Sequence, residues 1–591
     1  MLSYRKLAMR VLGRPLNTGG GNNSPRPASQ RAAALVLTAA MLTTFTAPAF
    51  AGTWYIEDGD ITISAGESGN NVTQNENTTK NDTDTIITNR EEGASSHTVT
   101  IDAKDKDDKV EVTLKDVNID TSKQSKAAVS VTGSGDTTIE LDGDNELKSG
   151  AGHAGLEHNK TDTSGELTIQ DKDNNGSLEA AGGFKGAGIG SAVSNDAQVK
   201  ITGGNITATS DDWGAGIGSG SSGTGTVEIT GGEINATGGY LGAGIGGGCN
   251  GSGNVTISGG TITAAGGDGA AGIGGGYYNG ATVTITGDAV IKNASNTKYG
   301  AGIGGGNGSD GNVTISGNAK IENATGGYGA AGIGGGAFSS PDKIGNGNVV
   351  IKDNAKIDNV QGGAYGAGIG GGIFGLSNVT IEGNTKVNVT GGAGGAAIGG
   401  GAGAENNSDN NGNQITIKSN ENGSPTINAV GGGTDEGEEI VIGGAGIGAG
   451  CESDADADIT LEGKVTITAT AGKDNVAIGA NGIEQEFSGL AEGSSITRYD
   501  SEGNDTTLPT DPGYPVPADT SSSGGGSAGA SVQESVFPGL IVTDKDGQRI
   551  SYTSIRGNNV LSLRVGRFTA SLRASLATLR QLRAEGIDTI T

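Results

Sequence analysis

Cysteine, histidine and arginine are scarce, and each scarcity excludes a class of site. The 591-residue chain has 2 cysteines and 3 histidines, so a small domain held together by disulfides is excluded. No arginine occurs from residue 91 to residue 497, and no histidine follows His158. Cleavage of a polysaccharide needs clustered carboxylates, usually with a basic group. Because the acidic residues lie singly in turns, we expect no enzyme activity.

Long apolar runs are also rare. A membrane-spanning helix needs about 20 apolar residues, and no segment after residue 51 approaches that length. Residues 1–51 combine six basic residues and no acidic one with the apolar run "AAALVLTAAML" and the small residues "AFA" at 49–51. This pattern predicts a secretory signal peptide, since the apolar run is too short for a retained anchor. We expect a secreted, extracellular chain, with association to the cell surface left open.

Basic residues are outnumbered throughout. The chain has 38 Lys and Arg against 66 Asp and Glu, and loss of the six basic leader residues would take its net charge from −28 to −34. Such a surface repels nucleic acid and anionic lipid, so we expect neither as a partner. It would attract divalent cations.

Glycine, in contrast, is abundant and periodic. The 114 glycines do not fall at every third residue, which excludes collagen, and "GAGIGGG" at 242–248 has near-copies along the chain. The central isoleucines are Ile189, Ile217, Ile245, Ile273, Ile303, Ile333, Ile369, Ile398, Ile447 and Ile478. We call these the marker residues. Their spacing gives a repeat of 28–31 residues with a few longer insertions.

Each repeat contains three short extended pieces bounded by Gly, Asn or Asp. In one repeat these are "GAGIGGG", "GNVTISGG" and "TITAAGG", with β-branched residues in the strands and turn formers between them. A single repeat cannot bury its apolar face, but stacked repeats can. We therefore predict an all-β fold: a parallel β-helix (β-solenoid) with three faces and roughly thirteen coils.

The composition divides the chain into five parts. We expect a signal peptide at 1–51, an N-terminal cap region at 52–99 and the parallel β-helix at 100–485. A linker, rich in Pro, Gly and Ser from 506, should follow at 486–535. A small α/β C-terminal domain should occupy 536–591, with a hairpin around Asp546-Gly547 and an amphipathic helix over 568–586. It stops within a predicted strand, so it could be truncated.

The positions of the two cysteines in the repeat predict whether they can form a disulfide. Cys249 and Cys451 each follow their marker by four residues, but they lie six coils apart. At about 4.8 Å per coil their separation of about 29 Å far exceeds the reach of a disulfide. We predict two free thiols.

Aromatic residues gather on both sides of the marker strip, four or five positions away. They are Phe184, Trp213, Tyr240, Tyr277, Tyr278, Tyr299, Tyr328, Phe338, Tyr365 and Phe374. If the strip glycines point outward, they form a bare floor between two aromatic columns, and a sugar ring could stack there. The alternative is that the aromatic rings stack on one another at the coil corners and that the glycines only permit tight bends.

Candidate metal ligands are weak. "DKDNNG" at 171–176 begins like a calcium loop, with Asp171, Asp173 and Asn175 as ligands, but the twelfth position is Gly182 instead of a glutamate. A polar turn is the other interpretation. His153 and His158 lie near Glu157 without a third placed ligand, which is a poor zinc site. We expect no cofactor, with Ca²⁺ left open.

The segment "TTIELDGDNELKSGAGHAGLEH" and the "VTISGGTITAAGG…GAGIGGG" repeats resemble the secreted or cell-surface right-handed parallel β-helix proteins of gut Gram-positive bacteria, of carbohydrate-binding-domain type. The resemblance covers about residues 100–480. It implies recognition of polysaccharide or surface glycan, with or without calcium, or adhesion. Our hypothesis is a non-catalytic glycan-binding β-helix. The alternatives are a structural rod without a ligand and, third, a polysaccharide lyase or hydrolase. The oligomeric state is left open.

Overall fold

The computed structural model describes two parts of the chain. The first comprises residues 51–514 except 297, 338–339, 341–342, 406–411 and 435–441. The second comprises 540–543, 552–557, 560–565, 571–574, 582–583 and 589–590. Residues 1–515 and 516–591 form separate units, and each is described by itself. The predicted signal peptide lies outside the described residues except for Ala51. No helix within the described ranges has the length and apolar character needed to span a membrane.

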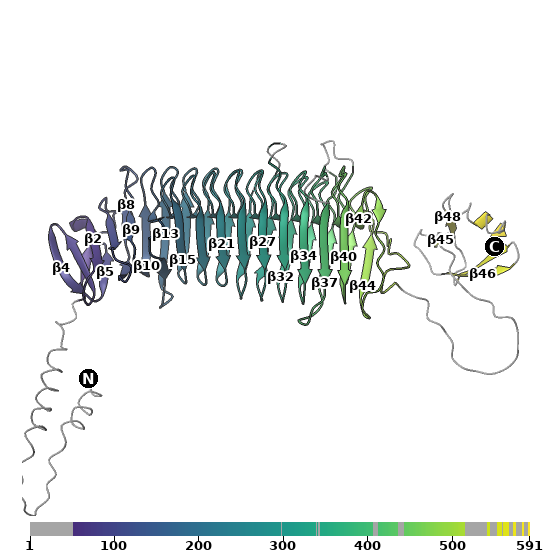
Figure 1. Ribbon diagram of the computed structural model, residues 1–591, viewed down its shortest axis with the longest axis horizontal. Coiled ribbons are helices and arrows are strands. Elements are labelled where there is room, and N and C mark those ends of the chain that lie inside the picture. The colour runs from purple at the N-terminus through teal and green to yellow at the C-terminus, as the bar shows by residue number, and fades with distance from the viewer. Residues whose placement is uncertain are drawn as a thin grey trace, which may run out of the picture. The chain divides into compact units, whose positions relative to one another are not determined.

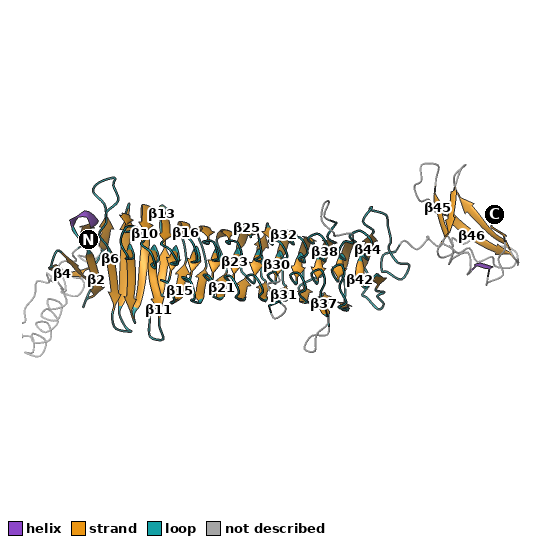
Figure 2. Cartoon of the chain, turned by 90° about the horizontal axis from the view of Figure 1, so that it is seen from above, coloured by secondary structure: helices purple, strands orange, loops and turns teal. Residues whose placement is uncertain are grey.

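The larger unit is a parallel β-solenoid with three rows of strands, as predicted (Figures 1 and 2). It has about 14 turns, against the roughly thirteen expected. Row A contains four strands that precede the first marker, β2 (Ile61–Ala65), β6 (Val99–Ala103), β9 (Val129–Gly133) and β11 (Leu156–Lys160). It continues with the marker strands β14 (Ile189–Gly190), β17 (Ile217–Gly218), β20 (Ile245–Gly246), β23 (Ile273–Gly274), β26 (Ile303–Gly304), β30 (Ile333–Gly334), β33 (Ile369–Gly370), β36 (Ile398–Gly399), β39 (Ile447–Gly448) and β42 (Ile478–Ala480).

Row B follows each marker strand along the chain. Its strands are β1 (Thr53–Tyr55), β5 (Thr85–Thr88), β7 (Lys109–Lys115), the first half of β10 (Asp136–Lys148), β12 (Leu167–Gln170), β15 (Asp196–Ile201), β18 (Gly225–Ile229), β21 (Gly253–Ile257), β24 (Ala281–Ile285), β27 (Gly311–Ile315), β31 (Gly347–Ile351), β34 (Ser377–Glu382), β37 (Asn413–Lys418) and β40 (Ala457–Glu462).

Row C completes each coil. Its strands are β8 (Asn118–Asp120), the second half of β10, β13 (Gly176–Gly182), β16 (Asn205–Ser210), β19 (Glu233–Thr237), β22 (Thr261–Ala265), β25 (Val290–Ser295), β28 (Lys320–Ile321) with β29 (Ala324–Thr325), β32 (Lys356–Gln361), β35 (Lys386–Thr390), β38 (Thr426–Val430), β41 (Thr466–Thr470) and β44 (Ser495–Tyr499).

Identical residues stack because the coils are in register. Ile217 pairs with Ile245, and Ile245 pairs with Ile273, in parallel. Val255, Ile257 and Ile262 from the other two rows are buried beside them in one continuous core. Burying an isoleucine stabilises a fold by about 1.5–3 kcal/mol, and every coil repeats this contribution.

The N-terminal end departs from parallel stacking. After a short 3₁₀ helix (Ile56–Asp58), β2 pairs antiparallel with β3 (Asn70–Gln74), and β3 pairs antiparallel with β4 (Asn77–Asp82). The indole Nε1 of Trp54 donates to Asp82 at 2.8 Å. Antiparallel strands cannot continue the coil, so they end the stack at residues assigned from sequence to the cap region.

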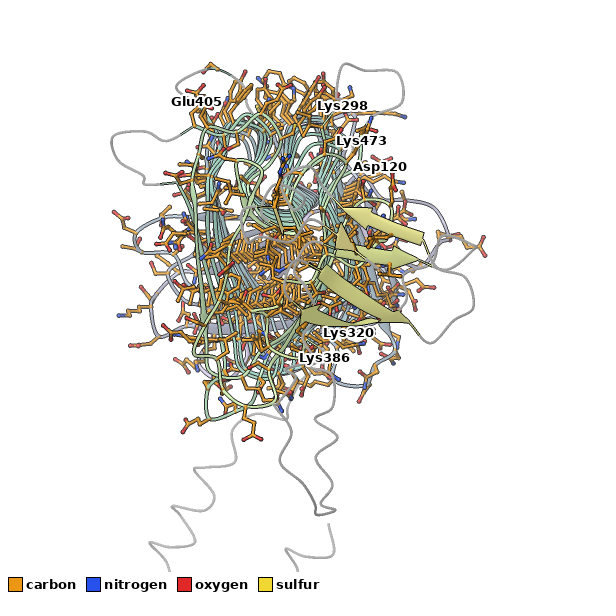
Figure 3. All side chains as sticks on the ribbon, turned by 90° about the vertical axis from the view of Figure 1, so that its right-hand side faces the viewer. Asp120, Lys298, Lys320, Lys386, Glu405 and Lys473 are labelled. Carbon is orange, nitrogen blue, oxygen red and sulfur yellow. The ribbon has the colours of Figure 1, made fainter. Side chains whose placement is uncertain are left out.

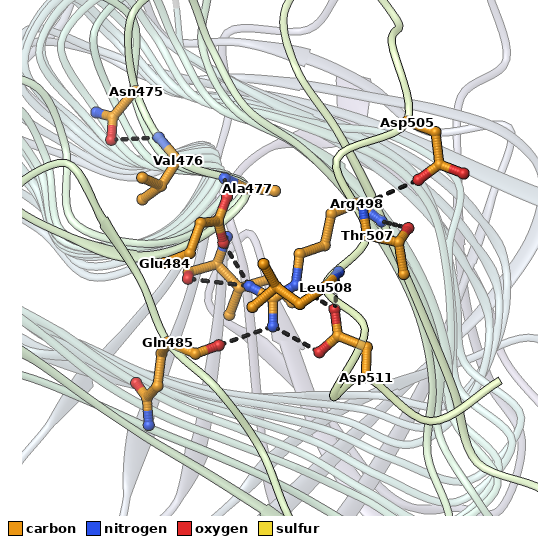
Figure 4. Close-up of polar contacts among 11 residues, drawn as sticks. Asn475, Val476, Ala477, Glu484, Gln485, Arg498, Asp505, Thr507, Leu508 and Asp511 are labelled. Atoms are coloured by element: carbon orange, nitrogen blue, oxygen red, sulfur yellow. Dashed lines mark hydrogen bonds and ion pairs between the residues drawn. The ribbon is translucent and has the colours of Figure 1, made fainter. Parts of the chain in front are cut away.

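The C-terminal end is closed by a segment that the sequence did not reveal. Strand β44 pairs with β41 and places Arg498 where the preceding coils have Ala469 and Ala429. Its guanidinium lies over the end of the core and bonds Glu484, Asp511 and the carbonyls of Ile478 and Gln485 (Figure 4). Residues 486–514 are therefore folded, which corrects the prediction that a linker begins at 486.

The smaller unit contains β45 (Leu540–Thr543), β46 (Tyr552–Gly557), β47 (Val560–Val565), β48 (Ser571–Ala574) and β49 (Thr589–Ile590). The predicted hairpin is wrong, because β45 pairs with β48 and β46 pairs with β47. The predicted helix is wrong over residues 571–574, which form a strand. In "TASLRAS" apolar residues also alternate at a spacing of two, so pairing with β45 decides between the two patterns.

Candidate functional site

The marker strip is buried, which corrects the expectation of an exposed glycine floor. All residues from Gly242 to Cys249 are buried, and the Ala243 N–H donates to the Gly247 carbonyl at 2.9 Å. The strip is therefore a tight loop that projects Ile245 into the core. The segments on either side of it form a row of loops along one edge of the solenoid (Figure 1).

Neighbouring backbone explains why the strip is glycine. A Cβ on Gly244 would lie 2.6 Å from the carbonyl oxygen of Gly272 and 2.8 Å from the nitrogen of Ala265. A Cβ on Gly246 would lie 2.0 Å from the carbonyl oxygen of Gly274, and Gly246 has φ of +133°. Glycine is needed here for close backbone approach, in line with the second interpretation of the sequence.

The two aromatic columns meet above the buried strip. A backbone hydrogen bond joins the two columns between neighbouring coils. Its donor is the N–H of the residue four positions after a marker, and its acceptor is the carbonyl of the residue four positions before the previous marker. The Cys249 N–H donates in this way to the Trp213 carbonyl at 2.7 Å, and the Ala402 N–H to the Tyr365 carbonyl at 2.8 Å. The columns therefore form one ridge, which we call the aromatic crest. Its exposed members are Phe184 (43%), Tyr240 (55%), Tyr278 (36%), Tyr299 (42%), Tyr328 (49%) and Phe374 (40%).

The remaining predicted aromatic residues also fall on this ridge, with one exception. Trp213, Tyr277 and Tyr365 are half-buried. Phe338 lies outside the described residues. Charged side chains flank the crest: Lys298 precedes Tyr299, and Figure 3 places Lys298, Lys473 and Asp120 at the same edge, opposite Lys320 and Lys386.

At one end of the crest, Phe184 and Trp213 have ring centroids 5.9 Å apart with a 42° tilt. The ammonium of Lys185 lies 4.4 Å from the indole centroid and 5.1 Å from the phenyl centroid. A cation held over aromatic faces is attracted by their quadrupoles. Lys185 thus fixes both rings while one edge of Phe184 faces solvent.

In the middle of the crest, Tyr299, Tyr328 and Tyr365 follow one another on three successive coils. Their centroids are 6.5 Å and 5.4 Å apart, and both contacts are edge-to-face. Such pairs contribute about 0.5–1.5 kcal/mol beyond area burial. The rings pack on one another, as the second interpretation of the sequence stated, yet the rings of Tyr299 and Tyr328 remain about half-exposed.

A third group lies one coil before this run. The hydroxyl of Tyr277 donates to that of Tyr278 at 2.7 Å, and Lys343 lies 4.1 Å from the Tyr278 ring centroid. Burial, followed by this hydrogen bond, raises the pKa of Tyr277 to about 12. The Tyr277 ring lies directly over Gly269, where a Cβ would approach it to 2.2 Å.

Several crest residues adopt a left-handed backbone that large side chains rarely accept. Tyr278 has φ of +65°, Phe374 of +61°, Tyr365 of +71° and Lys185 of +71°. At the position of Tyr278 and Phe374, other coils place Ser194, Ser222, Asn250, Gly308, Gly403 and Glu452, all left-handed. At the position of Tyr365, the coils on either side place Gly329 and Gly394. The left-handed region costs a large side chain about 1–2 kcal/mol.

An open groove of about 490 Å³ runs beside Phe184, where row C meets the crest. Its lining residues are Ser122, Lys148, Ser149, Ala151, Ala181, Gly182, Gly183, Phe184, Thr209, Ser210 and Asp211. These residues come from four successive coils, since Thr209 pairs with Ala181, Ala181 with Lys148, and Lys148 with Asp120. The groove therefore runs along the solenoid axis.

The predicted calcium ligands serve the turn itself. Asp171 accepts from the backbone N–H of Asn175 at 3.2 Å and of Gly176 at 3.0 Å, and the Asn175 amide donates to Asp142. Asp173 is exposed. Within the described ranges, no three His, Cys, Asp or Glu residues come together as a group able to hold a metal ion.

The histidine cluster is built around a buried carboxylate. Glu157 accepts from His153 Nδ1 at 2.8 Å, from the Ala154 N–H at 3.1 Å and from the Asn159 amide at 3.0 Å. His158 points elsewhere, and its Nδ1 donates to the Gln198 carbonyl. Burial lowers the pKa of His158. The two histidines therefore do not share a site.

Both cysteines are free, as predicted, and both are buried. Burial raises the pKa of Cys249, and it raises the pKa of Cys451 to about 11. Neither thiol carries the properties of a reactive nucleophile, which needs a lowered pKa and access to solvent.

Comparison with known proteins agrees with the fold. A family model described as a beta helix repeat matches residues 199–221, 227–249, 255–277 and 313–337. Each match spans row B, row C and the next marker strip. No curated protein matches the chain, and no solved structure matches it. The matched repeats and the solenoid together make this a parallel β-helix repeat protein.

Proposed function

We propose that this parallel β-helix protein is a secreted, non-catalytic polysaccharide-binding or adhesive protein that uses the aromatic crest. The observation that carries the proposal is the left-handed backbone of Tyr278, Tyr365 and Phe374. At these positions the adjacent coils hold Asn250, Gly308, Gly329, Gly394 and Gly403. Large residues held in costly conformations are concentrated at functional sites.

The chemistry of the crest suits a sugar chain. The C–H faces of sugar rings pack on aromatic rings, while their hydroxyls need polar partners. The crest offers half-exposed rings on successive coils, with Lys185, Lys298 and Asp268 beside them. The buried glycine strip has no part in binding. The binding we propose requires no metal ion.

A glycan array probed with the full chain, with and without Ca²⁺, tests the proposal. Tyr365→Gly and Phe374→Gly should each weaken binding, because each removes one ring of the crest. Ser222→Gly occupies the same position as Phe374 in another coil and should bind like the parent chain. If no glycan binds, or if the two aromatic variants bind normally, the crest serves only the packing of a structural rod.

A further inference from the structure

We infer that the groove beside Phe184 is a subsite for an uncharged sugar chain lying along the solenoid axis. This rests on the proposed function and specifies one place on the crest, and one class of glycan, at which a sugar chain is bound. The groove is the point at which an exposed crest ring, Phe184, adjoins a cavity with hydrogen-bonding side chains on its walls.

The walls of the groove supply complementary groups for hydroxyls. Asp211 provides a carboxylate and Thr209 a hydroxyl, while Lys148 provides an ammonium on a coil two steps away. The floor of Ala181, Gly182 and Gly183 is small, so a ring can approach the backbone. Sugar-binding sites combine such apolar surfaces with a few placed polar groups.

The shape of the groove favours a chain over a single sugar. Its lining residues span four successive coils, and three intervals of about 4.8 Å give a length of about 14 Å. Phe184 is 43% exposed, and its ring is held by Trp213 and by the ammonium of Lys185. A ligand therefore meets a pre-oriented ring, which limits the entropy lost on binding.

Charge selects against acidic sugars. The ammonium of Lys148 is hydrogen-bonded to Glu146, and the carboxylates of Glu179 and Asp120 also act on it. Asp211 adds a further negative charge to the wall. Since these four acidic groups outnumber Lys148, Lys185 and Lys123, which also acts on Asp120, a uronate would be repelled, whereas a neutral hydroxyl can bond to either sign.

Fluorescence of Trp213 gives a local readout. The chain has two tryptophans, so Trp54→Phe leaves Trp213 as the only one. Titration of the full-length Trp54→Phe chain with cellohexaose, mannohexaose and hexagalacturonate should change the emission with at least one neutral hexasaccharide. Hexagalacturonate should bind at least tenfold more weakly.

Groove variants then locate the site. Asp211→Asn and Thr209→Val should each weaken binding of the neutral hexasaccharide about tenfold. The first removes a charged hydrogen-bond acceptor, and the second leaves a sugar hydroxyl without its partner. Thr237 is the register partner of Thr209 one coil further on and does not line the groove. Thr237→Val should therefore bind like its parent.

The outcomes separate the two proposals. If the crest variants Tyr365→Gly and Phe374→Gly lose glycan binding on the array while Asp211→Asn and Thr209→Val keep it, the groove subsite is wrong and the crest proposal stands. Preference for hexagalacturonate would overturn the choice of an uncharged sugar. Absence of binding to every glycan on the array would overturn both proposals.

Discussion

Arg498 and Asp511 form a bidentate ion pair in which neither side chain has any exposed surface: Nε lies 2.7 Å from Oδ2, and Nη2 lies 2.9 Å from Oδ1. Burial disfavours the charge of Arg498, but Asp511 and Glu484 outweigh it, and the pKa of Arg498 lies above its usual range. Phe487 lies beneath the guanidinium, 5.7 Å away at the ring centroid. This group covers the last coil of the core.

We predict that Arg498→Met destabilises the C-terminal coils by about 3–5 kcal/mol, because it leaves Asp511 buried and unpaired. A solenoid loses coils from its ends, so the measurement should be local. Hydrogen exchange should become faster in β41, β42 and β44 and stay unchanged in β20 to β24.

A double variant checks the cause. Arg498→Met combined with Asp511→Leu removes both charges and should recover most of the protection in β41. Equal losses in the single and double variants would mean that the chain segment, and not the ion pair, closes the end.

The second prediction concerns the buried strip. Gly244→Ala should prevent normal stacking, because its Cβ would lie within 3 Å of three backbone atoms, the Gly272 carbonyl oxygen and the nitrogen and carbonyl oxygen of Ala265. The free energy of unfolding in urea should fall by more than about 4 kcal/mol. Gly93→Ala is the control, since its Cβ meets nothing within 4 Å, and it should change stability by less than about 0.5 kcal/mol. Tolerance of Gly244→Ala would contradict the tight loop.

The period of the sequence predicted much of the fold, because register in a solenoid is a local property. Equal spacing of Ile217, Ile245 and Ile273 places each above the last, and the same arithmetic separates Cys249 from Cys451. Whether the glycine strip is buried or exposed could not be predicted this way. It depends on carbonyls of neighbouring coils, such as that of Gly272, which no alternation pattern encodes.

The sequence predicted which aromatic residues line the candidate site, but not how they are arranged. Spacing placed the aromatic residues in two columns, but the columns join through hydrogen bonds between different coils. The left-handed positions also have no signature where an aromatic replaces glycine, as Tyr365 does between Gly329 and Gly394. One feature of the sequence could have indicated the segment that closes the C-terminal end of the solenoid. Arg498 is the first arginine after Arg90, and it occupies a position that is alanine in the preceding coils.

The third prediction concerns the thiols. Cys249 and Cys451 are 3% and 4% exposed, and burial raises both pKa values, that of Cys451 to about 11. Iodoacetamide at pH 8 should therefore leave both cysteines unmodified in the folded chain and modify both in guanidinium, as measured by mass spectrometry. Fast modification of either thiol without denaturant would show that the crest opens.

The fourth prediction concerns pH. Burial lowers the pKa of His158 in the folded chain, so the unfolded chain binds this proton more readily. The free energy of unfolding should therefore fall as pH drops below about 6.5, the ordinary value for histidine. The fall in Tm between pH 7 and pH 5 should be smaller in His158→Asn than in the parent chain. His97→Asn replaces a half-exposed histidine and is the control. In this variant Tm should fall between pH 7 and pH 5 as much as in the parent chain. Equal slopes in the parent and His158→Asn chains would contradict the prediction.

The last prediction separates the stability of the crest from its function. Phe374 has φ of +61° and a ring that lies against Gly403, 2.6 Å from where a Cβ on that glycine would be. Phe374→Gly removes a left-handed strain of about 1–2 kcal/mol together with part of the ring packing. We expect the free energy of unfolding to stay the same or to rise, in contrast to an ordinary loss of phenylalanine, which costs about 3–5 kcal/mol.

Phe374→Asn is the matched variant, because Asn250 holds the same position with φ of +56°. It should be as stable as Phe374→Gly, since asparagine tolerates this conformation. If both variants are stable and both lose glycan binding, the phenylalanine is kept for its ring and not for the fold. A loss of stability of the ordinary size in both variants would instead make Phe374 a packing residue and would remove the main argument for binding at this part of the crest.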